Sequence, residues 1–147
     1  MPLLFSYGKL PVEEVRTFLW ETDGEFPTPL SAHVDIDSYA GKLSEFSDFA
    51  VCRDGEDMVG MISCYTNQPP LGYISNVCVK KPYQARKVFS RLLQLLRTNV
   101  KEPGISRLRL EVDVDNDKAR RIYGHYGFRI LETRPDSRKV LMELDLD

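Results

Sequence analysis

One segment of the chain carries residues whose types and spacing could support proton transfer. In LEVDVDNDKARRIYGHYGF (110–128), Asn116 and Tyr123 lie seven residues apart, so both would project from one helix face. Ala119 lies between them, and its small side chain leaves room above that stripe. A phenol held at a strand–helix edge can donate a proton to a leaving group. Alternatively, Tyr123 and its neighbour Tyr126 simply pack in the core, and the spacing alone favours this structural interpretation.

A second segment has the pattern of an anion site built from backbone amides. KPYQARKVFSRLL (81–93) follows the apolar run YISNVCV (73–79) and opens a helical pattern. The first amides of a helix that begins near Tyr83 would have no partner inside the helix, and the helix dipole adds partial positive charge there. The amides from Gln84 to Phe89 are therefore predicted to present hydrogen-bond donors to an anion.

The side chains of this second segment have opposing effects. Arg86 and Lys87 could add charge-assisted contacts to an anion. Turns that hold phosphate usually carry glycine, which lets the ligand approach the backbone closely, and this segment has none. Lys87 and Phe89 are expected to narrow that approach unless their side chains turn aside.

The sequence does not assign a general base. Glu111 alternates with apolar residues, so its side chain faces either a groove or solvent. His125 lies about 200° around the helix from Tyr123 and is expected to be exposed. The other candidates for contact with a second substrate are three polar residues: His33, Ser75 and Asn76.

The periodicity of apolar residues predicts one mixed α/β domain over residues 1–147, without repeats or linkers. Strands are predicted at 3–7, 48–55, 57–66, 73–80, 106–113, 128–134 and 139–145. Helices are predicted at 11–21, at 35–47, from near Tyr83 to Pro103-Gly104, and at 116–127. A proline-rich loop is expected at 26–33, with turns at 54–56 and 135–137. The order is β-α-α-β-β-β-α-β-α-β-β, with a strand–helix–strand core over 73–113.

The composition is that of an ordinary soluble globular protein, with 42% apolar and 29% charged residues. No apolar run approaches the roughly 18 residues that span a membrane, and the N-terminus lacks the features of a secretory signal. The three cysteines form no CxxC and have no histidine at ligand spacing, so no metal site is expected. An odd number of cysteines without a signal favours reduced thiols and a cytoplasmic location. These cysteines are Cys52, Cys64 and Cys78.

The net charge of −2 hides a separation of charge along the chain. Residues 13–57 contain twelve acids and three bases, whereas residues 58–101 contain seven bases and no acid. An acidic part beside a basic part would suit one cationic and one anionic ligand, although chance clustering of solvated charge is an equal alternative. The acidic part disfavours a nucleic-acid partner.

Two quoted segments resemble the GNAT acyltransferases. VDVDNDKARRIYGHYGF (112–128) is very similar to their C-terminal acetyl-CoA motif, N-x-x-A-x-x-x-Y followed by the G-F of the next strand. Upstream, YISNVCVKKPYQARKVFSRLL (73–93) aligns with their strand and pyrophosphate loop, Q/R-x-x-G-x-G/A. Gln84 matches the first position of that loop, whereas Lys87 and Phe89 replace both small residues. The resemblance spans roughly residues 48–145. It implies a central mixed, mostly antiparallel sheet of about six to seven strands flanked by about four helices.

The resemblance also implies roles for residues. Tyr123 would be catalytic, protonating the departing thiolate, and Asn116 would contact the pantetheine arm. The strand at 77–79 would splay from the strand at 106–112 and hydrogen-bond pantetheine through main-chain groups, while the amides of the loop would take the pyrophosphate. The implied cofactor-binding residues are Val77, Cys78, Val79, Gln84, Ala85, Arg86, Lys87, Val88, Phe89, Asn116 and Ala119.

By the same resemblance, acetyl-CoA is the cosubstrate and the acceptor is a primary amine of a small molecule, attacked directly in a ternary complex. A faint similarity of residues 26–43 to acyltransferases of bacterial glycan synthesis slightly favours an amino sugar. The amine would enter over the N-terminal helices and the 26–33 loop, where acidic residues favour a cation. The terminal strand pair offers an edge at which a homodimer could form.

Two alternatives belong to other functional classes. In the first, the GNAT fold survives as a catalytically impaired binding or regulatory module, because Lys87 and Phe89 have degraded the CoA site. In the second, the basic tract at 80–101 binds a polyanion, which predicts steeply salt-dependent binding. The acidic part of the chain argues against this second alternative.

Overall fold

The computed structural model describes residues 2–25, 29–134 and 136–146. The order of strands and α-helices is the one predicted from the sequence, and parts of the loop at 26–33 and the turn at 135–137 lie outside the described residues. The elements are β1 (Leu3–Gly8), α1 (Val12–Thr22), α2 (Ile36–Phe46), β2 (Ser47–Asp54), β3 (Asp57–Gln68), β4 (Leu71–Val79), α3 (Val88–Asn99), β5 (Arg107–Asp113), α4 (Asp117–His125), β6 (Arg129–Arg134) and β7 (Lys139–Asp145). Short 3₁₀ turns occur at Asp23–Glu25, Leu30–Ala32 and Lys81–Arg86.

The strands form one seven-stranded sheet in the order β1-β2-β3-β4-β5-β7-β6. The neighbouring strands pair antiparallel, except for β4 and β5, which pair parallel. The predicted mixed, mostly antiparallel sheet is therefore confirmed. The parallel pair needs a crossover connection, and α3 supplies it.

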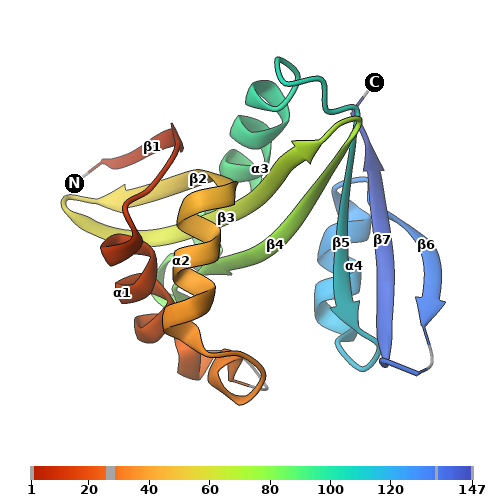
Figure 1. The fold of residues 1–147 in the computed structure, drawn as a ribbon, viewed down its shortest axis with the longest axis horizontal. Coiled ribbons are helices and arrows are strands. Elements are labelled where there is room, and N and C mark those ends of the chain that lie inside the picture. The colour runs from red at the N-terminus through yellow and green to blue at the C-terminus, as the bar shows by residue number, and fades with distance from the viewer. Residues whose placement is uncertain (1, 26–28, 135, 147) are drawn as a thin grey trace.

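The parallel pair is held together at one end only. β4 and β5 pair at three positions, Leu71–Arg107, Gly72–Leu108 and Tyr73–Arg109, after which the two strands separate (Figure 1). A Cβ atom on Gly72 would lie 2.9 Å from Leu108 Cδ2, so glycine is what lets the two strands approach at this junction. Beyond the junction, the facing edges of β4 and β5 border a V-shaped opening in the sheet. The sequence-based expectation that these strands splay is confirmed.

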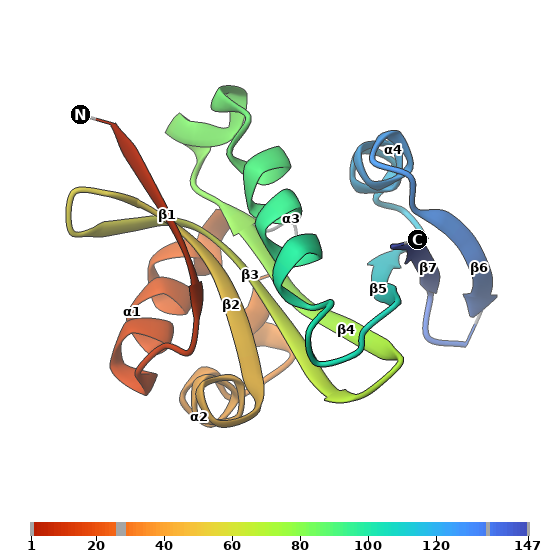
Figure 2. The same ribbon diagram turned by 90° about the horizontal axis from the view of Figure 1, so that it is seen from above.

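Helices cover the two halves of the sheet differently. α1 and α2 lie on one face of the β1–β4 half, α3 lies on the opposite face, and α4 lies on the α3 side of β5 and β7 (Figure 2). One apolar cluster joins α3 to the sheet through residues such as Leu92, Leu96 and Leu108, and a second joins α1 and α2 to it through Phe18, Leu43 and others. No described helix covers the α1–α2 side of the β5–β7–β6 half (Figure 2). That side is therefore free to carry polar groups.

A buried carboxylate supports the β5–β7–β6 half. Glu143 on β7 is only 1% exposed, and it accepts hydrogen bonds from Arg109 Nε at 2.7 Å and Arg129 Nη2 at 2.9 Å. The hydrogen bond from Arg109, supported by that from Arg129, lowers the pKa of Glu143 below its ordinary value of 4.5. Because the pKa is lower in the folded protein than in the unfolded chain, this carboxylate stabilises the fold above pH 4.5 and loses that effect as pH falls through the lowered pKa.

Glu143→Gln is therefore expected to reduce the free energy of unfolding by about 1 to 2 kcal/mol at pH 7. The difference from wild type should shrink as pH falls from 4.5 through the lowered pKa of Glu143, because the wild-type carboxylate then becomes protonated as well. Urea denaturation at pH 7 and pH 3 measures both quantities, with Glu132→Gln on the exposed strand β6 as the control. An equal loss at the two pH values would contradict an electrostatic role for Glu143.

The outer edge of the sheet is β6, whose six residues are all exposed. Ile130 and Leu131 are large apolar residues on this strand, with 55% and 43% of their surface accessible. The homodimer expected at this edge stays a prediction. None of the described helices is long and apolar enough to cross a membrane.

Candidate functional site

The half of β4 beyond the junction with β5 has a free main-chain edge. Residues 77–79 pair with β3 on one side only, through Ile62, Met61 and Gly60. At the end of this edge, Gln84 Nε2 donates a hydrogen bond to the Val79 carbonyl at 2.9 Å. The remaining edge groups are therefore positioned to bind an extended ligand by adding to the sheet.

The helix that follows begins later than the sequence predicts. Residues Lys81–Arg86 form a 3₁₀ turn, and α3 starts at Val88 rather than near Tyr83. The first described i→i−4 hydrogen bond of α3 runs from the Arg91 amide to the Lys87 carbonyl at 3.3 Å. The amides of residues 88–90 precede that bond, so they are the dipole-enhanced donors at this helix start.

Lys87 explains why the helix starts where it does. Its backbone has φ 58° and ψ 25°, the left-handed conformation that glycine adopts most easily. Residues in this conformation cannot continue a right-handed helix, so the 3₁₀ turn and α3 remain separate elements. The side chain of Lys87 is exposed. The chain thus keeps a glycine-like backbone at this position without glycine.

Lys87→Gly is expected to raise the free energy of unfolding by about 0.5 to 1 kcal/mol, because glycine removes the strain of a Cβ atom in the left-handed region. The gain is reduced by the greater freedom of glycine in the unfolded chain. Thermal and urea denaturation would measure it. Lys81→Gly, at a neighbouring position outside the left-handed region, is the control and should not stabilise. A loss of stability in Lys87→Gly would show that this backbone conformation is unstrained.

Phe89 faces inward and joins α3 to α4. Its ring lies 5.8 Å from the ring of Tyr123 and 5.2 Å from that of Tyr126, both in edge-to-face geometry. Tyr123 also meets Phe128 at 5.6 Å. These four residues, the aromatic bridge, connect the start of α3 to α4 behind the opening between β4 and β5. The narrowing of the backbone approach expected from Lys87 and Phe89 stays a prediction.

Tyr123 has the protonation state that a general acid requires. Burial, with a smaller contribution from nearby Cys78, raises the pKa of Tyr123 to about 12, so the hydroxyl keeps its proton near neutral pH. No described residue forms a hydrogen bond with this hydroxyl. Tyr123 also packs against the apolar core, as the structural interpretation of its sequence position expects. Its catalytic role stays a prediction.

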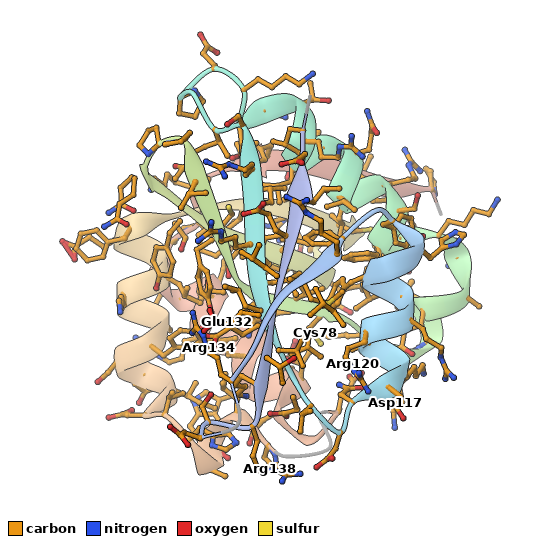
Figure 3. All side chains as sticks on the ribbon, turned by 90° about the vertical axis from the view of Figure 1, so that its right-hand side faces the viewer. Cys78, Asp117, Arg120, Glu132, Arg134 and Arg138 are labelled. Atoms are coloured by element: carbon orange, nitrogen blue, oxygen red, sulfur yellow. The ribbon has the colours of Figure 1, made fainter. Side chains whose placement is uncertain are left out.

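Asn116 and Ala119 begin the helix that carries Tyr123. Asn116 precedes α4, and its Oδ1 accepts a hydrogen bond from the Ala119 amide at 3.1 Å, which makes it the N-cap. The Asn116 side chain therefore has a structural function in addition to the ligand contact implied by the resemblance. Asp117 and Arg120 form an ion pair on α4 (Figure 3).

Cys78 lies near the centre of Figure 3, which views the molecule from the β6 side. It is a free, buried thiol on β4. Burial raises the pKa of Cys78 to about 11 despite a hydrogen bond with Thr22, so the thiol stays protonated near neutral pH. A protonated thiol is a poor nucleophile. Cys78 thus contributes its main-chain groups and its packing to this region.

A bulge in β4 places polar groups on the α2 side of the opening. The register between β3 and β4 shifts after Ser63, leaving Ser75 as the extra residue. Ser75 Oγ lies 2.9 Å from Ser63 Oγ, and the Ser75 carbonyl accepts a hydrogen bond from the Tyr39 hydroxyl at 3.1 Å. Asn76 is 8% exposed, and its Oδ1 accepts no hydrogen bond from any described residue. A buried acceptor without a protein partner is typical of a site that a ligand or water completes.

Glu111 lies on β5 next to the junction of β4 and β5, on the α2 side of the sheet. Its Oε1 accepts a hydrogen bond from the Tyr73 hydroxyl at 3.0 Å, and its Oε2 lies 3.0 Å from Arg134 Nη1. Arg134 and Glu132 lie on the α2 side of β6, opposite Arg120 on α4 (Figure 3). Of the two positions expected for the Glu111 side chain, groove or solvent, the structure shows the groove. Both of its carboxylate oxygens are engaged, one by Tyr73 and the other by Arg134. His33 and His125 are exposed and take no part in this arrangement.

Comparison with solved structures supports one architecture. A GNAT-family protein from Desulfovibrio desulfuricans superposes with a TM-score of 0.80 at 20% identity, covering 99% of this chain and 100% of that one. The ribosomal-protein-S18-alanine N-acetyltransferase from Escherichia coli gives 0.75 at 17% identity over 98% and 95% of the two chains. PaiA N-acetyltransferase from Thermoplasma acidophilum, solved in complex with coenzyme A, gives 0.74 at 18% identity over 99% of each chain. At these identities the likeness concerns the fold.

Sequence comparison adds the family. The chain is 28% identical over 82 residues to "GCN5-related N-acetyltransferase 6, chloroplastic" from Arabidopsis thaliana, a match that covers 54% of this chain and 28% of the relative. The chain thus spans about a quarter of the length of this relative. A model of the family described as "Acetyltransferase (GNAT) family" matches residues 12–128, which include the opening, the aromatic bridge and Tyr123. The chain is therefore a member of the GNAT acetyltransferase family.

Proposed function

We propose that this protein is an acetyl-CoA-dependent N-acetyltransferase that acts on the primary amine of a small molecule. The observation that carries the proposal is the opening between β4 and β5, which combines a free main-chain edge with a protonated Tyr123. An extended thioester arm fits such an edge, and a phenol that keeps its proton suits a leaving thiolate. By the same proposal the protein works in the cytoplasm, where its three free cysteines stay reduced.

The residues present fit acetyl-CoA in three respects. The main-chain groups of residues 77–79 would hold the pantetheine arm, the amides at the start of α3 would meet the pyrophosphate, and Asn76 Oδ1 is a buried acceptor near the opening. Acetyl-CoA supplies an activated acyl group. Amides at the free edge of β4 would polarise the thioester carbonyl as charge develops on its oxygen.

The reaction would proceed by direct attack. The neutral amine nitrogen forms a bond to the carbonyl carbon, the carbon–sulfur bond breaks, and Tyr123 gives its hydroxyl proton to the departing thiolate. The proton lost by the amine passes to water, and Tyr123 regains a proton afterwards. A covalent route through Cys78 is disfavoured because its thiol pKa is raised to about 11. Glu111 has both oxygens engaged, so no base is assigned.

A second candidate function rests on Phe89. Its ring joins α3 to α4, and the groups proposed to hold acetyl-CoA lie on both elements. If the aromatic bridge does not open to admit acetyl-CoA, the protein is a GNAT-fold binding or regulatory module without turnover.

The test is thiol release from acetyl-CoA in the presence of a panel of amines: amino sugars, amino acids, polyamines and a short peptide. Amine-dependent release of CoA, with the acetylated product seen by mass spectrometry, is the expected result. Neither binding of acetyl-CoA nor release of CoA with any amine would favour the binding or regulatory module.

A further inference from the structure

A pocket of about 260 Å³ lies at the junction of β4 and β5, on the side of the sheet that no described helix covers beyond β4. We call it the junction pocket, and its polar lining comes from Asn67, Gln68, Tyr73, Arg109, Glu111 and Arg134. Four of the six residues that pair β4 with β5 also line it: Leu71, Gly72, Tyr73 and Arg109. The pocket therefore adjoins the closed end of the opening in which the thioester would lie.

The junction pocket has two cations and one anion. Arg109 is 30% exposed, and among the described residues its guanidinium contacts only Glu143, through Nε. Its two terminal nitrogens donate to no described residue. Two such adjacent N–H groups match the paired oxygens of a carboxylate or phosphate. Arg134 adds a second guanidinium, which already pairs with Glu111 and Glu132. The side-chain amides of Asn67 and Gln68 add neutral donors.

The spacing of these charges suggests how an acceptor would lie. Glu111 is two residues beyond Arg109 on β5, so it lies about 7 Å further toward the opening. A cationic amine is favoured beside the carboxylate of Glu111 and disfavoured beside Arg109. The edge at Val77 lies about 13 Å along β4 from Tyr73. A ligand anchored at Arg109 must therefore carry its amine several bonds away from its anionic group to reach the thioester.

We propose that the junction pocket is the acceptor site and that it selects an amine which also carries a carboxylate or phosphate group, bound by Arg109. This deepens the proposed function and rests on it for the identity of the second substrate. It also departs from the sequence-based expectation that the amine enters over the N-terminal helices and the 26–33 loop, where acidic residues favour a cation. The acids of residues 13–57 are instead engaged in part elsewhere, for example Glu14 with Arg53 and Glu21 with Lys80.

Binding of matched ligands by calorimetry tests the proposal without requiring turnover. One pair is glucosamine and glucosamine 6-phosphate, and the other is 6-aminohexanoate and its amide. In at least one pair, the member that carries the carboxylate or phosphate should bind about tenfold or more tightly than the partner that lacks this anionic group. Preference in the first pair identifies phosphate as the anion, and preference in the second identifies carboxylate.

Two variants localise the effect. Arg109→Gln should abolish the preference for the ligand with the anionic group. Arg129→Gln removes the other arginine bound to Glu143 but lies outside the pocket, so it should keep the preference. Circular dichroism shows whether each variant is folded, and Arg134→Gln, at a more exposed position, provides a second test with a smaller expected loss. Equal binding within both pairs, or a preference that survives in Arg109→Gln, overturns the proposal. A charge preference that holds while no amine is acetylated would instead overturn the proposed function.

Discussion

Tyr123→Phe is expected to lower kcat for acetyl transfer by about 100-fold while leaving the dissociation constant of acetyl-CoA within about twofold of wild type. The substitution removes only the hydroxyl, so the ring can keep its contacts with Phe89 and Phe128. The loss should appear in kcat because the proton is needed only as the carbon–sulfur bond breaks. Steady-state kinetics and calorimetry with acetyl-CoA measure the two quantities separately.

Tyr126→Phe provides the matched control. Tyr126 is in the same aromatic bridge and also contacts Phe89, but its hydroxyl is assigned no role. Its kcat should stay within about threefold of wild type. If Tyr123→Phe weakened acetyl-CoA binding as much as it lowered kcat, Tyr123 would be a packing residue rather than the acid.

Phe89→Ala is expected to bind acetyl-CoA about tenfold more tightly than wild type. Groups proposed to hold the ligand lie on both α3 and α4, so the ring that joins these helices must move before the ligand can connect them. Each edge-to-face contact contributes about 0.5 to 1.5 kcal/mol. If both contacts must break, the affinity for acetyl-CoA is weakened by about 10- to 100-fold. The same substitution should lower the stability of the free protein, because Phe89 packs against the core.

Phe89→Leu separates size from aromatic contact. Leucine fills much of the same space but loses the ring interactions, so its acetyl-CoA affinity should fall between wild type and Phe89→Ala. Lys87→Gly should change affinity little, because the Lys87 side chain is exposed and its backbone already has the glycine-like conformation. Weaker acetyl-CoA binding in Phe89→Ala would mean that the ring supports the site instead of obstructing it.

Much of the fold could be predicted from the sequence because its elements have strong local signals. The period-two alternation of 106–113 and the amphipathic pattern of α3 identify buried faces without reference to any partner. The start of α3 was predicted about five residues too early, since apolar periodicity does not reveal the sign of φ at Lys87. A glycine at that position would have indicated the break.

The candidate site was only partly predictable, because its chemistry depends on contacts between distant residues. Tyr123 was identified through the resemblance of its motif. The bridge from Phe89 to α4, the hydrogen bond from Tyr73 to Glu111, and the pairing of Arg109 with Glu143 join residues more than 30 positions apart. Alternation within β5 placed Arg109 and Glu111 on one face, but the face left without a helix is a property of the assembled sheet.

The most direct test of the account is a calorimetric titration of the protein with acetyl-CoA, desulfo-CoA and ATP, at low and moderate salt. We expect acetyl-CoA to bind with micromolar affinity that survives added salt, and desulfo-CoA to bind slightly more weakly. ATP should bind much more weakly, because the pantetheine arm contributes contacts along β4 that ATP lacks. Absence of acetyl-CoA binding at millimolar ligand, in both the wild type and Phe89→Ala, would contradict it.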